Sequence, residues 1–132
     1  MSILAHTKEL LRHLLPAIQR MPKIERIDGA GAEMKRAAFD IIAHFAIAYY
    51  CPERREEYIR MMIGDYARLQ AAFEIALLQG IIMESKKLPI AERMERIEKG
   101  ISRWRTALSS QRQERHQCPG KSSGDASSPQ KM

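Results

Sequence analysis

The residues most able to do chemistry are four histidines, two cysteines and the carboxylates near them. His6 and His13 stand seven residues apart, which places them on one face of a helix, and Glu9 lies four residues before His13. Metal sites in helical bundles need a matching set on a second helix, commonly a Glu-x-x-His pair, and no other segment offers one. We therefore expect a surface face here, with no metal ion and no other cofactor.

The remaining reactive side chains favour structural roles. His44 lies inside the apolar run "IIAHFAIAYY", a setting typical of a hydrogen-bonded packing residue. Cys51 and Cys118 lack the CxxC spacing of a zinc site and indicate no disulfide framework. The sequence contains no glycine-rich phosphate loop, GxSxG elbow or HExxH helix. Because no reacting site is assembled, we expect that the protein is not an enzyme.

Basic residues carry the main positive signal. The 132 residues have a formal net charge of +6, and residues 1–36 and 84–110 each hold seven basic and four acidic residues. Such zones suit an anionic partner such as RNA or DNA, and they suit equally a solvated surface that keeps the protein soluble. The candidate nucleic-acid contacts are Lys23, Arg26, Arg93, Arg96, Lys99, Arg103 and Arg105.

Ion pairs within the last helix are the alternative role for these cations. Glu92 with Arg96, and Glu95 with Lys99, have the spacing of intrahelical pairs, each contributing roughly 0.2–0.5 kcal/mol. The other arginines of this segment have no near acidic partner in the sequence. Both roles therefore stay open for the basic residues.

Apolar residues recur at helical spacing in four segments. The predicted helices span about residues 3–21, 32–50, 53–85 and 89–110. Pro16 is expected to kink or break the first helix, and Pro89 to sit in the first turn of the last. The basic, polar tail 111–132 is expected to be disordered. Four amphipathic helices with short connections predict that residues 1–110 form an all-α, up-down-up-down antiparallel four-helix bundle.

Two residues are predicted structural anchors. Pro22 fixes the turn after the first helix, because proline disfavours helix at the residue before it. Trp104, the only tryptophan, continues the apolar seam of the last helix that includes Ile97 and Ile101. The apolar runs are too short for a membrane span, the N-terminus lacks signal-peptide features, and cysteines are few, so we expect a cytoplasmic protein without membrane contact.

Three stretches of the sequence resemble a known family. They are "MPKIER" at residues 21–26, "YARLQAAFEIALLQGI" at 66–81 and "EKGISRWR" at 98–105. The order of these parts is similar to that in the four-helix-bundle family of the accessory variability determinant proteins of diversity-generating retroelements. The same family contains the intervening-sequence proteins encoded within bacterial large-subunit ribosomal RNA genes. The resemblance covers about residues 8–108.

The resemblance implies a homopentamer with a basic surface. For the retroelement branch it further implies a non-catalytic accessory protein that binds a reverse transcriptase and its template RNA. Residue by residue, it points to Lys23, Arg26 and Trp104, with the arginines of the last helix as further contacts. The alternative is a structural or protein-binding homo-oligomer with no nucleic-acid role, in which the basic residues only maintain solubility.

Overall fold

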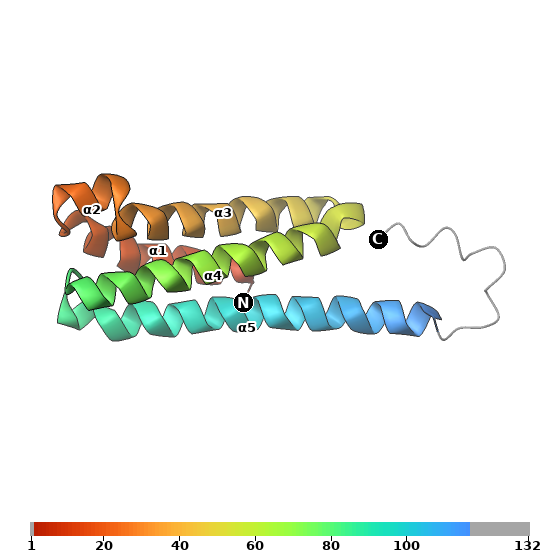
Figure 1. Ribbon diagram of the computed structural model, residues 1–132. Coiled ribbons are helices and arrows are strands. Elements are labelled where there is room, and N and C mark those ends of the chain that lie inside the picture. Colours follow the sequence, from red (N-terminus) through yellow and green to blue (C-terminus); the bar gives the residue numbers. More distant parts are fainter. Residues whose placement is uncertain (1, 117–132) are drawn as a thin grey trace.

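The computed structural model describes the backbone of residues 2–116 and the side chains of residues 2–111. Its elements are α1 (Ile3–Gln19), α2 (Lys23–Asp28), α3 (Ala30–Tyr50), the 3-10 helix η1 (Pro52–Arg54), α4 (Arg55–Gln79) and α5 (Glu84–His116). All regular structure in the described residues is helical, and the four long helices pack antiparallel (Figure 1). The predicted all-α four-helix bundle is therefore confirmed.

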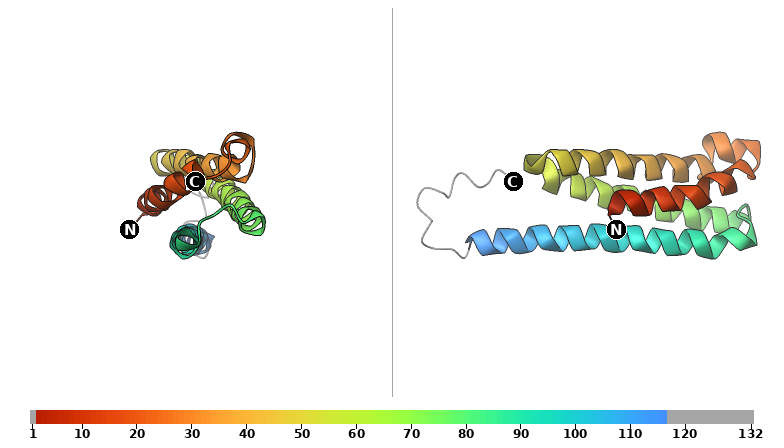
Figure 2. Two further views of the ribbon diagram at one scale, coloured as in Figure 1. Left: turned by 90° about the vertical axis from the view of Figure 1, so that its left-hand side faces the viewer. Right: turned by 180° about the vertical axis from the view of Figure 1, so that it is seen from behind.

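Two antiparallel pairs build the bundle, with α3 along α4 and α1 along α5. Seen end-on, the long helices surround a common core, and α2 lies outside it on the side away from α5 (Figure 2, left). Every long helix contributes fully buried side chains, including Leu10, Leu14, Met34, Ile41, Met62, Leu69, Ile90 and Ile97. Burying each side chain of this size contributes about 1.5–3 kcal/mol, so the apolar seams hold the bundle together.

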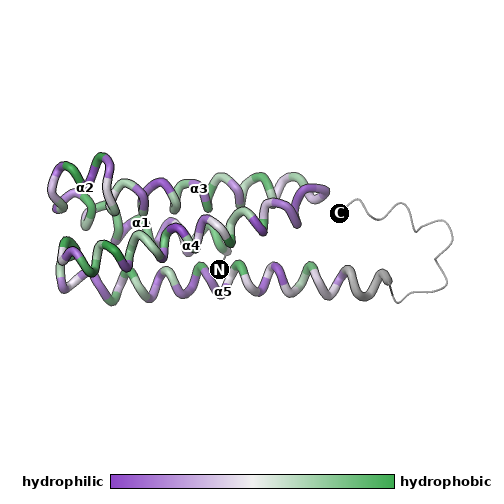
Figure 3. Tube along the Cα trace, in the orientation of Figure 1, coloured by the Kyte–Doolittle hydropathy of each residue, from purple (hydrophilic) through white to green (hydrophobic). Residues whose placement is uncertain are grey.

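Apolar and polar residues alternate along the long helices (Figure 3), as expected for rods that each bury one face. On α5 the predicted seam is confirmed, because Ile90, Met94, Ile97 and Ile101 are buried and Trp104 is half-buried. None of the helices in the described part of the chain combines the length and apolar character needed to cross a membrane.

The connection between α4 and α5 comes earlier than predicted. Helix α4 ends just before Gly80, which adopts the left-handed conformation with φ of 69°. The Gly80 N–H donates to the Leu77 carbonyl at 3.1 Å and the Ile81 N–H donates to the Ala76 carbonyl at 3.3 Å, the two bonds of a Schellman motif. The expectation of one helix from 53 to 85 is therefore wrong, because apolar spacing continues past a glycine that ends the helix.

Helix α5 is longer than predicted at both ends. It begins at Glu84, so Pro89 lies inside the helix and not in its first turn. It continues to His116, which places residues 111–116 of the expected tail in the helix. This segment contains no Gly or Pro and is rich in Gln, Arg and Glu, which have good helix propensity. Residues 117–132 of the expected disordered tail lie outside the described residues.

The first connection contains a helix that the sequence did not predict. Helix α2 follows Pro22, whose carbonyl accepts hydrogen bonds from the backbone N–H groups of Glu25 and Arg26 at 2.9 and 3.1 Å. The Glu25 carboxylate then accepts the Ala30 N–H at 3.0 Å, which satisfies a donor at the start of α3. The two glycines that made this segment look non-helical, Gly29 and Gly31, lie at the start of α3 and not in α2, and the bond from Glu25 supports the start of α3.

The expected break at Pro16 does not occur, since α1 runs without interruption from Ile3 to Gln19. Pro16 is exposed and lies within about one turn of the helix end. The hydrogen bond that proline cannot donate is therefore lost on the solvent side, where water can take its place.

Gly64 inside α4 and Gly80 at its C-terminal cap predict opposite effects of the same substitution. Gly64→Ala should raise the free energy of unfolding by about 0.5–1 kcal/mol, because Gly64 is exposed inside the helix and an added Cβ meets nothing within 4 Å. Gly80→Ala should lower it by about 1–2 kcal/mol, because φ of 69° strains an L side chain. Urea denaturation measures both, and two changes of the same sign would contradict the assigned C-cap.

Candidate nucleic-acid interface

Basic residues line the side of α5 that faces α1. Arg93 and Arg96 are about one helical turn apart, and Arg103 follows about two turns later, so the three share this side. Helix α1 brings two histidines against them, because it packs along α5 with Ile3 close to Gly100. We call the resulting set the basic strip, which consists of His6, His13, Lys86, Arg93, Arg96 and Arg103.

The pKa values of His6 and His13 are both lowered in this basic surrounding. Burial lowers the pKa of His6, and the charges of Arg96 and Arg103 lower it further. Burial also lowers the pKa of His13, with basic residues of α5 adding to the effect and Glu9 opposing it. Burial and the nearby basic residues of α5 therefore both disfavour protonation of these two imidazoles.

Acidification is expected to destabilise the fold through His6 and His13. Their pKa values lie below the ordinary 6.5 in the folded chain, so just below pH 6.5 the unfolded chain binds more protons. The stability that depends on their neutral forms should be fully present above about pH 7. It should be lost as the pH falls through 6.5 toward the folded pKa values. Urea denaturation across this pH range measures the free energy of unfolding. In the variant His6→Gln/His13→Gln this free energy should fall less on acidification than in the wild type. A wild-type free energy of unfolding that does not fall between about pH 7 and pH 5.5 contradicts this assignment.

Arg96 and Arg103 form no ion pair or hydrogen bond with any residue in the described part of the chain. Arg93 is only loosely held, with its Nη1 3.6 Å from a Glu92 carboxylate oxygen and donating to the Pro89 carbonyl at 3.3 Å. The Arg93 Nε is buried without an acceptor among the described atoms. The expected pairing of Glu92 with Arg96 is wrong, because Glu92 approaches its neighbour Arg93 instead.

The other predicted contacts lie away from the basic strip. Lys99 faces solvent with its Nζ 3.7 Å from a Glu95 carboxylate oxygen, the pair that the sequence predicted. Arg105 lines a hollow of about 140 Å³ on the side of α5 that faces α4. Lys23 and Arg26 are exposed on α2, which lies on the far side of the bundle from α5 (Figure 2). The structure thus gathers three of the seven predicted cations, Arg93, Arg96 and Arg103.

Trp104 lies beside the end of the strip and packs on the core. Its ring centroid is 5.3 Å from that of Phe45 and 5.4 Å from the guanidinium carbon of Arg55. Phe45 belongs to α3 and Arg55 to α4, so Trp104 connects α5 to the ends of both helices. The other predicted anchor, Pro22, is the N-cap residue of α2.

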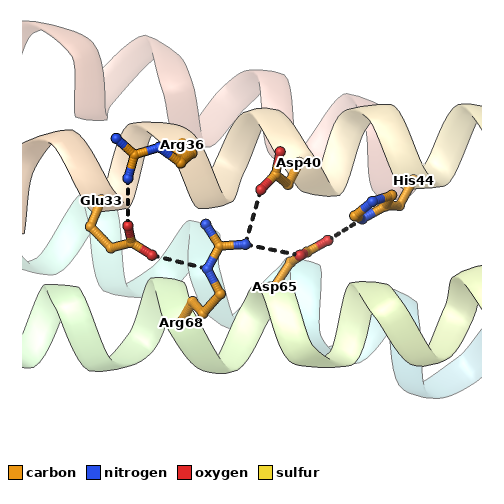
Figure 4. Close-up of polar contacts among 6 residues, drawn as sticks. All are labelled: Glu33, Arg36, Asp40, His44, Asp65 and Arg68. Atoms are coloured by element: carbon orange, nitrogen blue, oxygen red, sulfur yellow. Dashed lines mark hydrogen bonds and ion pairs between the residues drawn. The ribbon is translucent and has the colours of Figure 1, made fainter.

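A second polar cluster joins α3 to α4 (Figure 4) and consists of Glu33, Arg36, Asp40, His44, Asp65 and Arg68. Arg68 is its centre, with Nε 2.9 Å from Glu33 and Nη1 2.9 Å from Asp40 and 3.3 Å from Asp65. His44 Nδ1 lies 2.6 Å from Asp65 Oδ2, which confirms the predicted hydrogen-bonded packing role of His44.

This cluster is an interhelical clamp whose charged groups satisfy one another. Burial raises the pKa of Asp65, and the contacts with His44 and Arg68 oppose that rise. The sequence contained one signal for the cluster, the recurrence of polar residues at 33, 36, 40 and 44 along a single helical stripe. Their partners on α4 could not be assigned from that spacing.

Within the described residues, no group of three or more His, Cys, Asp or Glu side chains could hold a metal ion. Comparison of the chain with protein-family models gives no match, and comparison with curated proteins also gives none. The family resemblance of the sequence therefore stays a prediction.

Proposed function

We propose that the protein is a non-catalytic, cytoplasmic nucleic-acid-binding accessory protein whose basic strip contacts the phosphate backbone of RNA. The observation that carries this proposal is the pair of unpaired arginines, Arg96 and Arg103, on one side of α5. Unpaired guanidinium groups keep their N–H donors for phosphate oxygens, which they bind in a fork geometry. Glu9, the carboxylate of α1 nearest the strip, is already paired with Arg12 at 3.3 Å.

The side of the bundle away from α5 also carries exposed cations without an ion pair among the described residues, Lys23, Arg26 and Lys35, but carboxylates neutralise most of its arginines. On α3 and α4 the arginines are largely neutralised, with Arg36 2.7 Å and Arg68 2.9 Å from carboxylates of Glu33. Arg60 lies 3.3 Å from Glu56 in the same way. Because paired charges attract a third group weakly, these paired arginines should bind phosphate less well than Arg96 and Arg103.

The resemblance extends this proposal to the assembly. It implies a homopentamer and a reverse transcriptase as protein partner. In a closed ring, five copies of the strip would concentrate a modest charge per chain into a surface able to displace counterions from RNA. Sedimentation equilibrium should then give the mass of five chains, and the assembly should co-purify with its reverse transcriptase.

A salt titration tests the nucleic-acid role. An electrophoretic shift with structured RNA should show log K falling linearly with log salt, because each neutralised phosphate contributes a slope of about −0.7 to −0.9. The permanent charges of Lys86, Arg93, Arg96 and Arg103 predict a slope of roughly −3 per bound chain. An affinity that is equal at low and high salt, or no detectable shift at low salt, would refute the proposal.

A second candidate function is favoured by an exposed apolar surface. Ile24 and Ile27 of α2, with Ile75 and Leu78 of α4, are between 51% and 88% exposed. Helix α2 and the end of α4 are linked by the Gln79 side chain, which donates to Glu25 at 3.4 Å. Aliphatic residues collected at one end of the molecule indicate a protein contact, so this surface fits a structural or protein-binding homo-oligomer with no nucleic-acid role.

Removing apolar surface tests the second candidate. Ile24→Ser/Leu78→Ser should shift the sedimentation of the protein toward the single chain, because it deletes the two most exposed aliphatics of this surface without opening the core. Circular dichroism should stay unchanged. If the double variant sediments like the wild type, this surface is not the assembly contact.

A further inference from the structure

A hollow of about 360 Å³ opens beside the end of the basic strip, between the start of α1 and the helices α3, α4 and α5. It lies where α5 continues beyond the level of Ile3, the residue of α1 that packs against Gly100. This volume is near the lower end of the range for small-molecule sites, so the hollow suits one flat group better than an extended ligand. The side chains that give it chemical character are Phe45, Tyr49, Arg55, Arg103 and Trp104.

Aromatic rings form the apolar part of the hollow. The Tyr49 side chain is 56% exposed, so its aromatic ring is open to contact with a ligand. Its ring stacks on Phe45, with centroids 5.9 Å apart and an angle of 21°, and the Trp104 ring is tilted by 51° against Phe45 with centroids 5.3 Å apart. Partly exposed aromatic rings in a concave site are the usual platform for another flat ring.

Two arginines make the hollow cationic. The Arg55 guanidinium donates to the carbonyls of Ala48 and Tyr49, at 2.8 and 3.0 Å, and no carboxylate of the described residues pairs with it. Arg103 is likewise unpaired. The residues that line the hollow include no Asp or Glu. Charge complementarity therefore selects an occupant that combines a flat aromatic group with negative charge.

We propose that this hollow receives an unpaired base of a single-stranded RNA segment whose phosphates lie on the basic strip. The inference rests on the proposed function, because it assumes that the strip binds phosphate. Arg103 belongs to both the strip and the hollow, so the two form one continuous surface. A paired base cannot leave its stack without cost, so the protein should prefer single strands to duplexes.

Trp104 offers a direct readout, since the chain contains no other tryptophan. The wild-type protein is titrated at low salt with a uridine oligonucleotide of about 12 residues, with an abasic ribose-phosphate chain of the same length, and with a duplex of equal charge. The uridine strand should quench Trp104 emission and bind most tightly. The abasic chain should bind through its phosphates without quenching.

A matched pair of tyrosine variants separates base stacking from phosphate binding. Tyr49→Ala removes an exposed wall of the hollow and should weaken binding of the uridine strand roughly five- to a hundredfold, with an unchanged salt slope. Tyr50→Ala removes a ring that is 78% exposed and does not line the hollow, and that meets the Tyr49 ring edge-on with centroids 5.0 Å apart, so its loss of affinity should be clearly smaller than that of Tyr49→Ala. Circular dichroism of both variants confirms that the fold is retained.

The possible outcomes test the base site separately from phosphate binding by the basic strip. Salt-dependent binding of all three probes with equal affinity, with no quenching and no effect of Tyr49→Ala, would overturn the base site and leave the strip as a phosphate surface. Failure of every probe to bind at low salt would overturn both. Quenching of Trp104 by an acidic amphipathic peptide, and not by the uridine strand, would assign the hollow to a protein helix and overturn the inference.

Discussion

Replacing Arg96 and Arg103 together with glutamine is expected to weaken RNA binding about ten- to a hundredfold, since charge-assisted hydrogen bonds are worth roughly 1.5–3 kcal/mol each when made and part of that is recovered by water. The slope of log K against log salt should become less steep by about two. Folding should be unaffected, because both side chains are exposed and neither has a partner in the described structure. Fluorescence anisotropy with labelled RNA, measured at several salt concentrations, gives both quantities.

Lys99→Gln/Arg105→Gln is the charge-matched control for that experiment. It removes two positive charges from the same helix, but Lys99 is paired with Glu95 and Arg105 lies on the side that faces α4. We expect less than about a threefold loss, because long-range charge alone contributes little at physiological salt. Equal losses in the two double variants would show that net charge acts without a defined surface. Unchanged binding by the first variant would exclude the basic strip.

Truncation of Ile97 to alanine is expected to lower the free energy of unfolding by about 2–5 kcal/mol. Ile97 is fully buried between the arginines of the strip, on the most polar of the long helices. Only a narrow seam therefore attaches α5 to the bundle. A loss of this size is a large fraction of the roughly 5–15 kcal/mol that stabilises a domain, so the variant should unfold at clearly lower urea concentration.

Leu88→Ala is the matched control, because Leu88 lies on the same helix and is 66% exposed. Its truncation should change the free energy of unfolding by no more than about 0.5 kcal/mol. Similar losses for Ile97→Ala and Leu88→Ala would mean that α5 does not bury the seam described above. Thermal denaturation followed by circular dichroism provides an independent measurement of the same difference.

The buried faces of α3 and α5 followed from their residues. On α5 the steps between Ile90, Met94, Ile97 and Ile101 match the helical repeat, and these are the residues that the bundle buries. On α3 the apolar setting of His44 predicted a hydrogen-bonded packing residue, and its contact with Asp65 confirms it. Such patterns are local, because the helical repeat alone places residues three or four apart on one face.

The ends of the helices were harder to predict from the sequence, because several residues near them favour a helix end equally well. Gly80 and Pro89 are both helix breakers, and only the left-handed conformation of Gly80 shows which one ends α4. Helix α2 was missed because Gly29 and Gly31 weakened the whole segment in the sequence, whereas in the structure they lie after α2, at the start of α3, where Glu25 caps Ala30. Propensity is a weak preference of roughly 1 kcal/mol per residue, and tertiary contacts override it.

The sequence by itself determined that four amphipathic helices would bury their apolar seams and leave many cations outside, since burial of periodic apolar residues dominates folding. Only the tertiary structure decided which cations meet. Arg93, Arg96 and Arg103 form one strip with His6 and His13 because α1 packs on their side of α5, whereas other predicted contacts point elsewhere. The clamp around Arg68 likewise joins residues up to 35 positions apart. Helical spacing orders residues along one rod, but the rotation and pairing of rods come from side chains distant in sequence.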